Sequence, residues 1–142
     1  MTERRSHAAG FTMVELLVVL VILGLLASIA APRVLGYLGR ARGDTAELEM
    51  RNFQTAMDLF AIDVGRFPTQ QEGLAALVSA PGRAPGWAGP YLQVDKLPDD
   101  PWGNPYQYRI PGNEGRQYEI FTLGADNAPG GTGDAADVVV GR

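Results

Sequence analysis

The sequence predicts an α+β protein in which a long N-terminal helix packs on a small antiparallel β-sheet. Residues 11–31 form an apolar run, and a helical pattern continues over residues 32–65. Two short segments with aromatic and β-branched residues follow, at residues 106–110 and 118–123, separated by a turn that contains proline and glycine. We expect these two segments to pair as a hairpin that packs on the helix, and residues 138–140 to add a terminal strand.

The apolar run is long enough to cross a membrane. At about 1.5 Å per residue, it makes a helix of about 31 Å, which matches the roughly 30 Å hydrocarbon core of a bilayer. Glu15 lies inside the run, and the sequence places no Lys, Arg or His within one helical turn of it. A carboxylate at this depth costs on the order of 2.5 kcal/mol or more unless it is protonated or paired. Glu15 is therefore a functional candidate whose partner must come from elsewhere.

A cleaved secretory signal is the competing interpretation of the N-terminus. Arg4 and Arg5 precede the apolar run, and Ser28-Ile29-Ala30 has the small-x-small spacing of a signal-peptidase site. The length of the run, its glutamate and the helical pattern beyond residue 32 favour a helix that is retained. The positive-inside rule does not decide its orientation, because two arginines precede the run and three follow it, at Arg33, Arg40 and Arg42.

The second part of the helix is amphipathic. Pro32 removes a backbone donor and should kink or loosen the helix, and Gly36, Gly39 and Gly43 weaken the turns that follow. Gly65 and Pro68 should end it. Apolar residues recur in between at steps of four and three, and we expect this stripe to seat the domain on its own helix: Ala46, Met50, Phe53, Met57, Phe60 and Val64.

The remaining chain has room for one small globular domain. Thr69-Gln-Gln-Glu72 has the pattern of a capping box, which should open a short helix that ends before Pro81. Residues 81–90 and 97–105 are too rich in proline and glycine for regular structure, and Trp102 is expected to fill the core.

Composition and motifs exclude several functions. The 142-residue chain has a net charge of −4, which predicts no nucleic-acid partner. It has no cysteine, so it forms no disulfide, which is compatible with the cytoplasm or with export. Its one histidine, His7, lies in the leader, and common hydrolase and nucleotide-binding motifs are absent. We therefore expect a protein that is not an enzyme.

The C-terminal segment is the one stretch that suggests a ligand. Asp126, Asp134 and Asp137 lie in a glycine-rich loop, and carboxylate and carbonyl oxygens suit Ca²⁺. The spacing matches no complete calcium motif, so on spacing alone a solvated acidic turn is slightly favoured.

Gly10-Phe11-Thr12-Met13-Val14-Glu15 resembles the processing site of type IV pilins and type II secretion pseudopilins. The resemblance implies that a prepilin peptidase cleaves between Gly10 and Phe11 and methylates the new N-terminal phenylalanine. It also implies that Glu15 directs assembly. The cleavage would create an α-amino group about one helical turn from Glu15, and a neighbouring subunit could offer its own amine to this carboxylate.

Three further segments resemble the major pseudopilin family of type II secretion systems: Phe67–Leu74, Asp100–Tyr106, and Leu123–Asp126 with the following Gly-Gly and Asp134. The resemblance implies a structural Ca²⁺ in the C-terminal loop. Its ligands would be the side chains of Asp126 and Asp134 and the carbonyl of Leu123, with Asp137 a further candidate. Many relatives have a second acid after the position of Asp134, whereas this chain has Ala135, so the number of ligands stays open.

The resemblance divides the chain into a leader (1–10), a transmembrane and assembly helix (11–31), an amphipathic helix (32–65) and a periplasmic domain (66–142). It implies a homo-oligomeric helical filament that starts from the bacterial inner membrane. The implied partners are the prepilin peptidase, minor pseudopilins and an inner-membrane assembly platform. A type IV pilus pilin for adhesion or motility is the alternative, although the disulfide loop common in that group is impossible here without cysteine.

Overall fold

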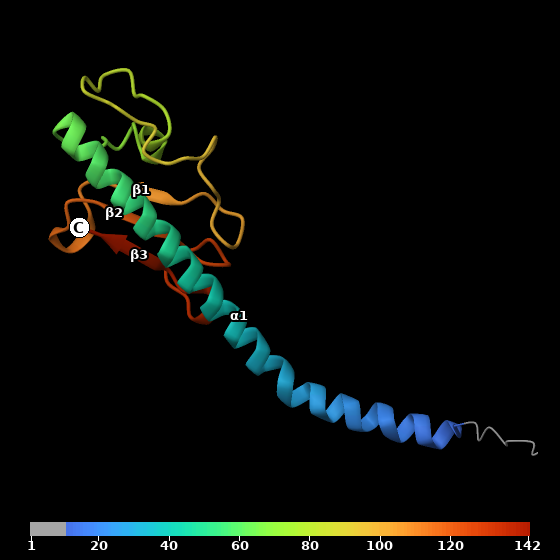
Figure 1. Cartoon of the computed structure of the whole chain (residues 1–142). Coiled ribbons are helices and arrows are strands. Elements are labelled where there is room, and N and C mark those ends of the chain that lie inside the picture. The colour runs from blue at the N-terminus through green and yellow to red at the C-terminus, as the bar shows by residue number, and fades with distance from the viewer. Residues whose placement is uncertain (1–10) are drawn as a thin grey trace, which may run out of the picture. The chain divides into compact units, whose positions relative to one another are not determined.

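The computed structural model of the chain describes residues 11–142. These residues divide into two compact units, and the boundary along the chain lies between Leu35 and Gly36. One helix, α1 (Met13–Val64), belongs to both units and passes through Pro32 without interruption (Figure 1). The ring of Pro32 therefore does not end the helix, although the residue still removes one backbone donor.

The first unit contains the exposed half of α1 (residues 13–35). Every residue from 11 to 35 is exposed, including the valine, leucine and isoleucine side chains that fill this stretch. The helix is long and apolar enough to cross a membrane, a test that a signal sequence near an N-terminus also passes. An apolar surface of this extent requires lipid or other protein to cover it.

In the second unit, α1 buries one stripe of side chains, as the amphipathic pattern predicted. The buried residues of this stripe are Ala46, Met50, Phe53, Ala56, Met57 and Phe60. All of them except Ala46 form one core with residues from the sheet and from the short helix η1 (Leu74–Leu77). Gly65 has a φ of 80°, a left-handed conformation that glycine adopts without strain, so it ends the helix where the sequence predicted.

The sheet has three antiparallel strands in the order β1 (Gln107–Arg109), β2 (Glu119–Thr122) and β3 (Val138–Gly141) (Figure 1). Tyr108 pairs with Ile120, which pairs with Val140, and all three side chains belong to the core. The hairpin and the terminal strand are confirmed, although each of the first two strands is shorter than its predicted segment. This small sheet packs against the amphipathic half of α1, because the sheet and the helix bury their apolar faces in the same core.

One local prediction is confirmed only in part, and another is wrong. The capping box at Thr69 forms, but the short helix that follows it is the four-residue 3₁₀ helix η1, which begins only after Gly73, a residue with a φ of 56°. Trp102 does not fill the core: it is only half-buried, and its indole N–H donates to Asp134 in the C-terminal loop. An indole needs a partner for its N–H, and the polar loop supplies one.

Candidate functional site

The start of α1 is organised by a capping box that the sequence analysis missed. The backbone N–H of Thr12 donates to Oε2 of Glu15 over 3.2 Å, and the N–H of Glu15 donates back to the hydroxyl of Thr12 over 3.2 Å. The Thr12 hydroxyl lies 3.4 Å from the same carboxylate oxygen. The Thr-x-x-Glu spacing in the sequence is typical of this motif. The motif stabilises the helix because it satisfies two of the backbone N–H groups that the first turn leaves unpaired.

The carboxylate of Glu15 thus lies at the positive end of the helix dipole. Within residues 11–142 it forms no ion pair. Phe11, the residue predicted to become the new N-terminus, is exposed. Gly10, the other half of the predicted cleavage site, lies outside the described residues. This end of the helix therefore presents an acid that accepts from the N–H and the hydroxyl of Thr12 but has no intramolecular cation in the described part of the chain.

Asp134 is the best-connected acid of the C-terminal loop (residues 123–137). Its Oδ1 accepts the Trp102 indole N–H over 2.8 Å, and its Oδ2 lies 3.1 Å from Nη1 of Arg42 on α1. Gly39, one turn earlier on α1, lies directly against it: a Cβ on Gly39 would be 3.0 Å from the Cβ of Asp134. The absence of a side chain at Gly39 lets the loop approach the helix backbone.

The other two acids among the predicted calcium ligands have hydrogen-bond partners of their own. Oδ1 of Asp126 accepts the N–H of Ala128 over 3.1 Å, in an exposed turn, and Oδ2 of Asp137 accepts the N–H of Gly130 over 2.9 Å. Within residues 11–142, no three acidic or histidine side chains lie close enough to hold a metal ion. Leu123 is half-buried at the start of the loop. The arrangement does not fit a calcium cage, because the side chain of Asp134 is bonded to protein donors at both oxygens.

A buried aspartate positions Trp102. Asp100 is only 4% exposed, and its Oδ1 accepts the backbone N–H groups of Trp102 and Asn104 over 3.0 and 2.8 Å. Its Oδ2 accepts the hydroxyl of Thr122 on β2. A carboxylate that accepts several hydrogen bonds can be buried at low cost. The Asp-Pro-Trp-Gly-Asn segment is thereby fixed to the sheet, which aims Trp102 at Asp134.

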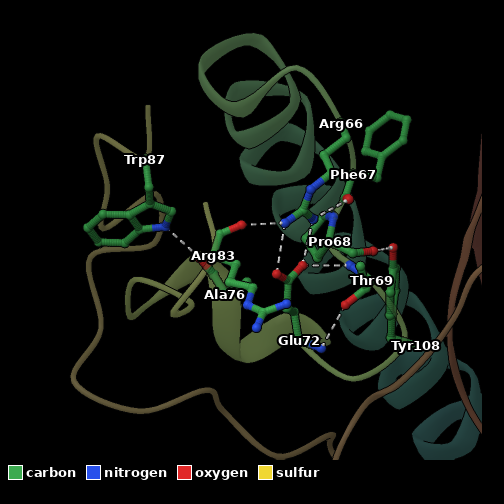
Figure 2. A network of polar contacts seen from close by, with 9 residues as sticks. All are labelled: Arg66, Phe67, Pro68, Thr69, Glu72, Ala76, Arg83, Trp87 and Tyr108. Carbon is green, nitrogen blue, oxygen red and sulfur yellow. Dashed lines mark hydrogen bonds and ion pairs between the residues drawn. The ribbon is translucent and has the colours of Figure 1, made fainter. Parts of the chain in front are cut away.

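A second polar network, around Arg66 and Glu72, follows the end of α1 (Figure 2). Nη1 and Nη2 of Arg66 lie 2.6 and 2.8 Å from the two carboxylate oxygens of Glu72, a bidentate pair. Nη2 also donates to the carbonyl of Arg83, and Oε2 of Glu72 accepts the N–H of Thr69. The bond from Arg66, with help from Thr69, lowers the pKa of Glu72 to about 2. The network joins the chain after α1 to η1 and to the loop that follows.

The comparisons with known proteins cover both units. Residues 33–141 match the family model described as type II secretion system protein G, and residues 5–31 match the prokaryotic N-terminal methylation motif. A protein named type II secretion system core protein G, from Pseudomonas aeruginosa, is 40% identical over 139 residues, with 95% of this chain and 96% of that protein covered. The protein of the same name from Vibrio cholerae is 42% identical over 139 residues and covers 96% of this chain and 93% of its own length.

A solved structure agrees with these matches. The crystal structure of the major pseudopilin from the type 2 secretion system of enterohaemorrhagic Escherichia coli is similar, with a TM-score of 0.59 and 30% sequence identity. The similarity covers 73% of this chain and 90% of that one.

Proposed function

Because the chain belongs to the protein G family of type II secretion systems, we propose that it is the subunit of a periplasmic filament. Identical subunits polymerise through the exposed half of α1, and the filament helps to move folded proteins across the outer membrane. One observation carries the proposal: the exposed half of α1, in which every residue is exposed, contains an acid without an intramolecular cation in the described part of the chain. A neighbouring subunit supplies both a cover for the helix and a partner for Glu15.

The chain is first a membrane protein with its leader in the cytoplasm and its domain in the periplasm. The exposed half of α1 has a length and composition suited to the bilayer. A prepilin peptidase then cleaves between Gly10 and Phe11 and methylates Phe11. The match of residues 5–31 to the methylation motif supports this step.

Cleavage adds the missing cation. The new α-amino group of one subunit lies against Glu15 of its neighbour, in surroundings of low dielectric where opposite charges attract strongly. Before assembly, the capping box with Thr12 gives the carboxylate two hydrogen-bond donors. On assembly, the Glu15 carboxylate exchanges its bonds to the neutral donors of Thr12 for a bond to a cation. Because a hydrogen bond to a cation is stronger, this exchange favours the polymer over the isolated subunit.

Minor pseudopilins and an inner-membrane assembly platform are the other proposed partners, and the subunit has a structural rather than an enzymatic role. A type IV pilus pilin for adhesion or motility is not favoured, because the similar proteins named above are components of type II secretion systems. Calcium binding through Leu123, Asp126, Asp134 and Asp137, which the family resemblance implies, is not part of this proposal, because both oxygens of Asp134 are bonded to protein groups. No step of the proposed assembly depends on it.

The test removes the charge of Glu15 without changing its shape. We expect Glu15→Gln to abolish filament assembly, because an unpaired buried amine costs roughly 3–5 kcal/mol per contact. Glu15→Asp retains the charge on a shorter side chain and should retain part of the assembly. Filaments are counted by electron microscopy after overproduction, while N-terminal sequencing checks that each variant is still cleaved and methylated. Normal filaments from a cleaved Glu15→Gln subunit would contradict the pairing role.

A further inference from the structure

We propose that Arg42 replaces a metal ion in this chain: its guanidinium neutralises Asp134 and keeps the C-terminal loop closed against α1 without calcium. The geometry carries this inference. Arg42 and Trp102 approach different oxygens of the same carboxylate, over 3.1 and 2.8 Å, from two segments that are distant in sequence. Both oxygens are therefore bonded to protein groups, and the negative charge is balanced by a cation of the chain itself.

The side chains of Arg42 and Asp134 are 38% and 39% exposed, so solvent partly screens their attraction. Three other contacts fix the pair in place. Asp100 anchors the backbone of Trp102, the Asp134 carbonyl accepts the N–H of Ala125 over 3.0 Å, and Gly39 lets the loop lie on the helix. Because these contacts fix Asp134 and Trp102 beforehand, the Asp134 side of the ion pair loses less side-chain entropy than that of an ordinary surface pair does.

The rest of the loop also satisfies its acids internally. Asp126 accepts a bond from Ala128, two residues further on, and Asp137 both accepts from Gly130 through its side chain and donates its own N–H to the carbonyl of Gly130. Each of the three carboxylates therefore has its own protein donor instead of facing a common centre. A divalent cation at Asp134 would have to displace Arg42, because both need the same oxygens and repel each other.

The test compares thermal unfolding of the full chain in detergent micelles, in chelator and with excess calcium. We expect the unmodified chain to melt at the same temperature in both conditions. Arg42→Gln should melt roughly 2–6 °C lower in chelator, since it loses a partly exposed pair and leaves Asp134 charged. Calcium should restore part of this loss by binding the freed carboxylate. Asp134→Ala should melt lower in both conditions, because it loses its bonds to Arg42 and Trp102.

Arg51→Gln is the matched control. Arg51 lies on the same helix and pairs with Glu47 over 2.6 Å, but it contacts no acid of the C-terminal loop. We expect its melting temperature to be the same with chelator and with calcium. The indole N–H resonance of Trp102 gives a second measurement in the native state, and Arg42→Gln should shift it in chelator while Arg51→Gln should not.

Two results would overturn the proposal. One is an unmodified chain that loses several degrees of melting temperature in chelator, which would show that a metal ion closes the loop. The other is an Arg42→Gln variant that equals the unmodified chain in chelator in both melting temperature and Trp102 resonance. That result would show that Asp134 is held without Arg42.

Discussion

Two Thr-x-x-Glu motifs in this chain form the same backbone hydrogen bonds but give their glutamates different partners. In both, the threonine N–H donates to the carboxylate and the glutamate N–H donates to the threonine hydroxyl, at Thr12–Glu15 and at Thr69–Glu72. Glu72 also has a bidentate arginine, whereas Glu15 forms no ion pair within residues 11–142. The comparison teaches that the motif supplies local donors only, and that the tertiary surroundings decide whether the carboxylate also acquires a cation from its own chain.

The two motifs also differ in what surrounds them. Thr12 and Glu15 begin an apolar helix whose residues are all exposed up to residue 38. Thr69 and Glu72 lie beside a folded core, and Figure 2 shows the Tyr108 hydroxyl donating to the carbonyl of Pro68 next to them. A motif against a core can acquire a cation from its own chain, whereas the motif at the start of the exposed apolar helix has none in the described part of the chain.

Removing the cation of the second motif should have the largest effect on the folded domain. Arg66→Gln leaves Glu72 charged and without its bidentate partner, and it also loses the bond to the Arg83 carbonyl. We expect the free energy of unfolding to fall by about 2 kcal/mol, or about 10 °C in melting temperature. Arg83→Gln is the control, because the network uses only the main-chain carbonyl of Arg83. Equal melting temperatures for both variants would contradict the role of the ion pair.

Acid should remove the same interaction in the unmodified chain. The pKa of Glu72 is lowered to about 2 in the folded state, against roughly 4.3 for an unperturbed glutamate. The stabilisation is therefore complete above about pH 4.3 and is lost as the pH falls towards 2. We expect Glu72→Gln to lose about 1–2 kcal/mol at neutral pH and to show a shallower decline in acid.

Urea unfolding at a series of pH values measures this difference. Glu114→Gln serves as the control, because the side chain of Glu114 is 78% exposed beside Arg116 and its replacement should leave the acid profile unchanged. A Glu72→Gln profile with the same slope as the unmodified chain between about pH 4.3 and 2 would exclude Glu72 as the group responsible.

The smallest effect should come from the threonines. Thr69→Val loses the hydroxyl that caps Glu72 and should lower stability by about 0.5–1 kcal/mol, whereas Thr69→Ser should retain it. Thr12→Val should leave the melting temperature of the domain unchanged and increase amide hydrogen exchange in the first turn of α1, because that end is fully exposed. A lowered melting temperature for Thr12→Val would instead show that the first turn of α1 contributes to the stability of the folded domain.

Local pattern was enough to predict much of the fold. The apolar run, the stripe from Ala46 to Phe60, the end of the helix at Gly65 and the three strands all follow from periodicity and from residues with strong backbone preferences. Glu15 could also be identified, because a charge in an apolar run is conspicuous in any fold. The Thr12–Glu15 spacing also predicts the cap. The same residues belong to the segment that resembles a prepilin-peptidase site, which suggests a different role for them.

Only the tertiary structure decided which polar groups meet. The choice of Arg66 for Glu72, of Arg42 and Trp102 for Asp134, and of Asp100 for the Trp102 backbone rests on contacts between elements that no local period encodes. The sequence by itself determined where the apolar surface lies, because burial follows from side-chain periodicity. Which charges are neutralised within the subunit depends instead on the distances set by packing, because hydrogen bonds act only over about 3 Å.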